Sequence, residues 1–141
     1  MPIEATAASA MFWPLAAQVA LTFVVLVLVL LTRIRSMSGG TTTMDSYKVY
    51  DGAMPDYVVQ ASRNYSNQYE MPVLFFVGGV LVIALGKVDD IFVLLGWIHV
   101  GARAVHALIH LTINQVAVRL LIFAVSALAV AAIWIRLALA L

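Results

Sequence analysis

Four long apolar segments limit what this chain can fold into. They cover residues 11–32, 57–86, 91–111 and 116–137. About 20 apolar residues in a helix cross the roughly 30 Å of hydrocarbon in a bilayer. Hydrophobic residues make up 64% of the 141 residues and charged residues only 11%, which is more apolar surface than a soluble domain of this length can hide. The sequence therefore predicts an all-α integral membrane protein, with one four-helix bundle over residues 1–141.

The composition excludes several kinds of chemistry. The chain has no cysteine, so it has no disulfide, no cysteine–metal site and no cysteine nucleophile. Any thiol that reacts here belongs to a substrate. The net charge is +1 and no run of basic residues is present, so we expect no nucleic-acid partner.

The charged loops predict how the protein lies in the membrane. Arg33, Arg35 and Lys48 belong to the loop over residues 33–56, whereas the loop over residues 87–90 is net acidic. Basic residues in short loops favour the cytoplasmic side of a membrane. We therefore predict that the 33–56 loop is cytoplasmic and that both termini lie on the outer side.

Polar residues occur on the segment 57–86 just before its long apolar run. Arg63, Asn67 and Glu70 are spaced i, i+4, i+7, and in a continuous helix residues with this spacing share one face. Ionisable groups are rare inside membranes, because they are costly there unless they pair or bind something. The spacing predicts a polar face on this helix.

A second polar stripe runs along the segment 91–111. His99, Arg103, His106 and His110 are spaced i, i+4, i+7, i+11, and Asn114 continues the series. At 1.5 Å per residue, Arg103 lies roughly 18 Å from the outer end of its helix, in the cytoplasmic half of the membrane. The same estimate puts polar groups of three helices at one depth. They are Arg63, Asn67, Glu70, Arg103, His106 and Arg119, with His110 close by.

Two readings of this convergence follow from the residues alone. In the first, Glu70 forms a buried ion pair with Arg103 or Arg63 and the cluster is structural. In the second, the positive charge that one carboxylate leaves uncompensated binds an anionic ligand, and we favour this reading. His106 and His110 have the spacing of metal ligands, but the nearby arginines would repel a cation, so we expect no metal.

These residues resemble the signature of a known family. Arg63-x-x-x-Asn67-x-x-Glu70, followed by Pro72 and Phe75-Phe76, is similar to the helix-2 motif of the MAPEG family, the membrane-associated proteins in eicosanoid and glutathione metabolism. Arg103-Ala-Val-His106 and Arg119, sixteen residues after Arg103, fall where enzymatic members carry an arginine, a histidine and an arginine. The resemblance covers residues 57–135.

The resemblance implies a homotrimer with glutathione bound as co-substrate in a cleft between subunits, open to the cytoplasm. It implies a bacterial-type member in the inner membrane that attacks a lipophilic electrophile or hydroperoxide. Carried over, the residues that hold glutathione are Arg63, Asn67, Glu70, Arg103, His106 and His110, and Arg119 is the catalytic residue that lowers the pKa of the thiol. His110 stands where many glutathione-using members have a tyrosine.

A non-catalytic function is the alternative. Family membership does not fix activity, and the same cleft is suited to an anionic membrane lipid or to a partner that the protein scaffolds. The two functions differ in what Arg119 does, since catalysis requires it beside a sulfur atom and binding requires only its charge.

Overall fold

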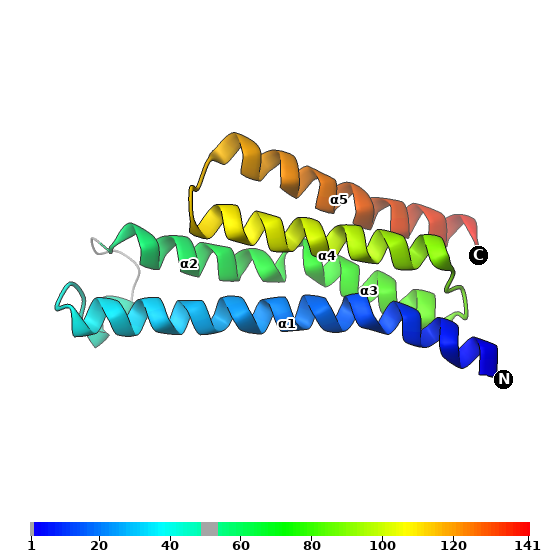
Figure 1. Ribbon diagram of the computed structural model, residues 1–141, viewed down its shortest axis with the longest axis horizontal. Coiled ribbons are helices and arrows are strands. Elements are labelled where there is room, and N and C mark those ends of the chain that lie inside the picture. Colours follow the sequence, from blue (N-terminus) through cyan, green and yellow to red (C-terminus); the bar gives the residue numbers. More distant parts are fainter. Residues whose placement is uncertain (1, 49–53) are drawn as a thin grey trace.

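The computed structural model describes residues 2–48 and 54–141, and its helices form four antiparallel rods (Figure 1). The elements are α1 (Pro2–Ser38), η1 (Met44–Tyr47), α2 (Asp56–Ser66), η2 (Asn67–Tyr69), α3 (Met71–Ala84), α4 (Asp90–Leu111) and α5 (Val116–Leu139). Four helical segments are long and apolar enough to cross a membrane, namely Ser9–Ser38, Asp56–Ala84, Asp90–Leu111 and Val116–Leu139. The protein is an all-α integral membrane four-helix bundle, as predicted.

The two ends of the bundle hold different connections (Figure 1). Both ends of the chain and the turn between α3 and α4 lie at one end, which we call the terminal end. The segment after α1 and the turn between α4 and α5 lie at the other, which we call the loop end. Residues 49–53 of the predicted 33–56 loop lie outside the described residues.

The first helix is longer than the predicted segment 11–32. It runs from Pro2 to Ser38, so that Pro14 lies inside it. Pro14 is buried against Gly96 of α4, where an added Cβ atom would lie only 3.1 Å from the Pro14 Cγ atom. A residue without a side chain at position 96 thus lets α1 approach α4 closely.

The second rod is not the single helix predicted over 57–86. It consists of α2, the 3₁₀ turn η2 and α3, and Glu70 between the last two has non-helical backbone angles (φ −94°, ψ −100°). Pro72 explains the interruption, because proline has no N–H to donate and its ring collides with the carbonyl four residues earlier. It also disfavours the α conformation at Met71. One continuous polar face through residues 63, 67 and 70 is therefore wrong.

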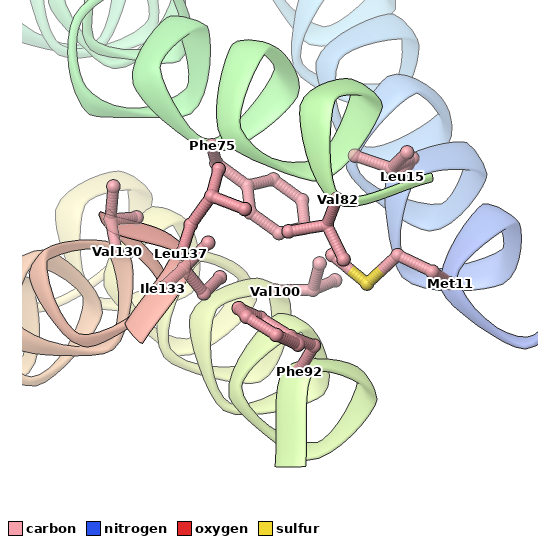
Figure 2. Packing of buried hydrophobic residues seen from close by; sticks show 9 residues of the cluster. All are labelled: Met11, Leu15, Phe75, Val82, Phe92, Val100, Val130, Ile133 and Leu137. Atoms are coloured by element: carbon pink, nitrogen blue, oxygen red, sulfur yellow. The ribbon is translucent and has the colours of Figure 1, made fainter. Parts of the chain in front are cut away.

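Apolar side chains of all four rods meet in the core (Figure 2). Its buried members are Met11, Leu15, Phe75, Val82, Phe92, Val100, Val130, Ile133 and Leu137. Most of them come from the residues of each rod nearest the terminal end. Trp134 borders this core and donates from Nε1 to the Leu74 carbonyl at 3.1 Å, which ties α5 to α3.

Asp89 fixes the start of α4 at the terminal end. Its Oδ1 atom accepts from the backbone N–H groups of Ile91 and Phe92, both at 3.0 Å, and Oδ2 accepts from Arg136 Nη2 of α5 at 2.5 Å. Burial by itself raises the pKa of Asp89, but the hydrogen bonds from Arg136, Phe92 and Ile91 outweigh it, so that the pKa is lowered. One carboxylate thus caps α4 and joins it to α5.

Candidate functional site

Buried polar side chains gather between the rods on the loop-end side of the apolar core. Each is at most 3% exposed, and they are Gln18, Asn64, Gln68, His99, Arg103, His106, His110 and Ser126. Polar groups at membrane depth are expensive unless they are paired, so a layer of eight needs either internal partners or a ligand. We call this set the polar layer.

Arg103 lies at the centre of the polar layer and is fully buried. Its Nη2 atom donates to the backbone carbonyl of Asn67 at 2.7 Å. Carbonyl groups at helix ends lack an intrahelical donor and can accept from a side chain instead. The interruption before Pro72 places the Asn67 carbonyl near such an end, so it can accept from Arg103. The Nε and Nη1 atoms of Arg103 have no hydrogen-bond partner in the described chain. Two nitrogen atoms of a buried cation are thus left without an acceptor among the described residues.

The predicted ion pair of Glu70 is not formed within the described subunit. Glu70 and Arg63 are both exposed, and the ion pairs among the described residues are Lys48–Asp45 and Arg136–Asp89. Glu70 still acts electrostatically on Arg103. The acid therefore lies near the polar layer and leaves the guanidinium of Arg103 without a carboxylate partner.

The two histidines nearest the loop end lie beside each other and beside the arginines. The rings of His106 and His110 are 5.8 Å apart and nearly perpendicular, and the Nδ1 atom of each is buried without a partner among the described residues. Arg119, Arg63 and Arg103 all act electrostatically on His110. The structure thus brings together residues of α2, α4 and α5 that the sequence grouped by depth alone.

Arg119 lies in the first turn of α5 and is half-buried. Its Nη1 atom donates to Oδ1 of Asn114, in the turn that precedes α5, at 2.6 Å. Its positive charge lies at a helix N-terminus, where the helix dipole also favours an anion.

Two polar residues of the second rod that were not predicted as site residues are buried. The residues that point inward are Asn64 and Gln68, each one position after a predicted residue. Gln18 of α1 donates to Oε1 of Gln68 at 3.1 Å, and Asn64 donates to the Ala107 carbonyl of α4 at 3.3 Å. The signal in the sequence is their i, i+4 spacing, which places both amides on one face of a helix.

His99 has a different role from the rest of its stripe. Its Nδ1 atom is 2.9 Å from Oγ of Ser126 on α5, and its ring lies 4.4 Å from that of Phe75. Ser126 was not predicted, since an isolated serine in an apolar run carries no periodic signal. This pair joins the polar layer to the apolar core.

A groove opens between α1 and α2 near the loop end. It has a volume of about 480 Å³ and is lined by Val29, Arg33, Met54, Val59, Ser62, Arg63, Tyr65 and Ser66. The described lining thus includes two arginines, Arg33 and Arg63. Among the described residues, no three histidines or acids are placed to hold a metal ion.

Comparison with known families gives one match. The model of the MAPEG family matches residues 11–139, which include every residue of the polar layer and all of the four membrane-spanning segments except the first two residues of Ser9–Ser38. No curated protein and no solved structure gave a match.

Proposed function

The chain belongs to the MAPEG family, and from that premise we propose that it is a glutathione-dependent membrane enzyme. It binds glutathione in a cleft between subunits and uses the thiolate against a lipophilic electrophile that arrives from the bilayer. Membership places the chain in a family of glutathione and eicosanoid metabolism. The specific activity is what we propose beyond that membership.

One observation carries the proposal. Arg103 is fully buried in the membrane-spanning region, has no carboxylate partner and retains two nitrogen atoms, Nε and Nη1, without acceptors. A buried guanidinium in this state strongly favours an anionic ligand, because an uncompensated charge in a low-dielectric site is costly. Glutathione supplies two carboxylates, which accept charge-assisted hydrogen bonds from a guanidinium.

The charge of each remaining residue indicates which part of glutathione it contacts. Arg63 and Arg103 bind the carboxylates, Glu70 accepts from the ammonium group, and Asn67, His106 and His110 offer polar contacts between them. His106 and His110 each have a buried ring nitrogen that lacks a partner in the described chain, which supports their contact with a ligand. This assignment leaves Arg119 for the sulfur.

The chemistry needs only the thiolate. The thiol loses its proton to water, and the resulting anion is stabilised by the guanidinium of Arg119 and by the N-terminus of α5. The sulfur lone pair then forms a bond to the electrophilic carbon while the leaving group departs with the electrons of its own bond. With a hydroperoxide, the thiolate sulfur forms a bond to the terminal oxygen while the O–O bond breaks and the rest of the molecule leaves as an alcohol. A second glutathione then attacks the sulfur of the resulting sulfenic acid, which gives the disulfide and water.

A homotrimer and the membrane orientation belong to the same proposal. Arg63 and Glu70 are exposed and belong to neither of the ion pairs among the described residues, and charged groups at this depth are expected to meet a ligand or a neighbouring subunit. The segment that follows α1 is cytoplasmic, because Arg33 and Arg35 lie near the end of α1 and Lys48 lies in the segment after it. The cleft at the loop end then opens to the glutathione of the bacterial cytoplasm, and the protein lies in the inner membrane.

Binding and thiolate formation in the detergent-purified protein test the function. We expect glutathione and S-hexyl glutathione to raise the melting temperature, glutathione alone to give a thiolate absorbance, and native mass spectrometry to show a trimer. Binding without a thiolate or turnover would favour the non-catalytic alternative. A protein that binds neither compound would contradict the proposal.

A further inference from the structure

We propose that Asn114 is the residue that positions Arg119 for its anionic ligand, an inference that rests on the function proposed above. Asn114 lies in the turn between α4 and α5 and continues the polar stripe of α4 beyond the end of the helix. It belongs to neither set of residues assigned to glutathione, and its role follows from its backbone and its side chain together.

The backbone of Asn114 adopts an unusual conformation. Its φ is +46°, and no other residue except glycine has a positive φ in the described part of the chain. Asparagine adopts this left-handed region more readily than other residues with a side chain. The Asn114 backbone N–H donates to the Ile109 carbonyl at 2.8 Å, which closes the end of α4. The conformation of the turn therefore fixes the position of the Asn114 Cα and Cβ atoms.

The side chain of Asn114 holds a specific atom of Arg119. The guanidinium only donates hydrogen bonds, so the atom 2.6 Å from Nη1 must be the amide oxygen. Charge-assisted hydrogen bonds of this kind are short and strong. An arginine at a helix end has a long flexible stem that can reach toward the membrane surface. The hydrogen bond to Asn114 keeps it at the polar layer.

A neutral partner preserves the charge that the site requires. A carboxylate in this place would hold Arg119 equally well, but it would compete with the thiolate for the guanidinium. The amide orients the cation without neutralising it. Moreover, Nδ2 of Asn114 has no hydrogen-bond partner among the described residues, so an N–H donor remains next to the guanidinium for the ligand.

Three variants separate positioning from turn formation. Asn114→Gly keeps the positive φ and the backbone hydrogen bond but removes the amide. Asn114→Asp keeps an acceptor and adds a negative charge. Gln115→Ala is the matched control, because Gln115 is an exposed neighbouring amide without a side-chain hydrogen bond.

The main readout is the pH titration of the thiolate of bound glutathione. We expect the midpoint in Asn114→Gly to rise by about one pH unit, a tenfold change in the thiolate equilibrium. Its kcat should fall about tenfold with KM within about twofold, because the interaction acts on the thiolate rather than on binding. Asn114→Asp should raise the midpoint further, and Gln115→Ala should match the wild type. An unchanged midpoint in Asn114→Gly would overturn the proposal, since the residue would then serve the turn alone.

A second readout does not depend on glutathione. In the ligand-free protein, a double-mutant cycle of Asn114→Gly and Arg119→Ala on thermal unfolding should show coupling between the two side chains. Absence of a thiolate in the wild type would contradict the proposed function. The double-mutant cycle would still test whether Asn114 and Arg119 interact. Additive effects of the two substitutions would overturn the positioning role whether or not the protein uses glutathione.

Discussion

The terminal end and the loop end of the bundle are stabilised by different interactions. At the terminal end, fully buried side chains such as Phe92 and Ile133 pack against each other, and Asp89 joins α4 to α5 with all its acceptors in use. Toward the loop end, Arg103 is equally buried but leaves two nitrogen atoms unpaired. Among the described residues, the carboxylate of Asp89 at the terminal end is paired, whereas buried polar groups toward the loop end lack partners. This difference separates stability from function along the length of a single bundle.

The largest change in stability should come from the core of the terminal end. Phe92→Ala removes a fully buried ring from the interface of α4 with the other rods and should destabilise the protein by about 3–5 kcal/mol. Thermal unfolding in mild detergent measures it. The matched control is Leu128→Ala on α5, whose side chain is 69% exposed and whose loss should matter by less than about 0.5 kcal/mol. Equal effects of the two would show that the terminal end is not a packed core.

Substitutions of the two arginines of α5 allow a direct comparison of the two ends, because Arg119 lies at the loop end and Arg136 at the terminal end. Arg119→Ala should lower turnover with a model electrophile by ~10²-fold or more, the usual effect of losing one preorganised charged group, with only a small change in melting temperature. Arg136→Ala breaks the ion pair with Asp89 at the terminal end; it should lower the melting temperature and leave turnover unchanged. A comparable loss of turnover in both variants would mean that activity does not depend on the loop end.

The hydrogen bond between Gln18 of α1 and Gln68 of the second rod should contribute less to stability than the core does. Gln18→Leu leaves Oε1 of buried Gln68 without its donor, and the loss should cost about 1–3 kcal/mol. Gln18→Leu combined with Gln68→Leu should cost less than the sum of the single changes, because neither polar group then remains unpaired. Denaturation of the four proteins in the cycle measures the coupling, and strict additivity would argue against the hydrogen bond.

The smallest effect is expected at the Asp89 cap. Asp89→Ala should cost about 0.5–2 kcal/mol, whereas Asp89→Asn keeps a capping oxygen and should lose less. Because the pKa of Asp89 is lowered in the folded protein, its stabilisation is complete at neutral pH and disappears as the pH falls through the folded pKa, below its ordinary value near about 4. Melting temperatures from about pH 6 to pH 2 should therefore fall more in the wild type than in Asp89→Ala. Parallel curves would show that the carboxylate contributes nothing.

The stripe on α4 shows what periodicity predicts well. His99, Arg103, His106 and His110 were expected on one face, and all four are buried on the inner side of an uninterrupted helix. The second rod shows where periodicity fails. Arg63, Asn67 and Glu70 were expected to share one face of a continuous helix, yet the helix is interrupted at Glu70, and Asn64 and Gln68 are the buried polar residues of this rod. The sequence contained Pro72, but the direction in which the rod continues after the interruption depends on its packing against the other rods.

By itself, the sequence determined the four membrane-spanning segments and their approximate ends, because a backbone in hydrocarbon must satisfy its hydrogen bonds within each helix. It also determined that polar groups of several helices share one depth, since depth follows from the rise per residue. Only the tertiary structure decided which groups meet. Arg103 pairs with the backbone of Asn67 rather than with Glu70, and Arg119 pairs with Asn114. These contacts depend on how far each helix is rotated and shifted against its neighbours, and close packing such as that of Pro14 on Gly96 sets that offset.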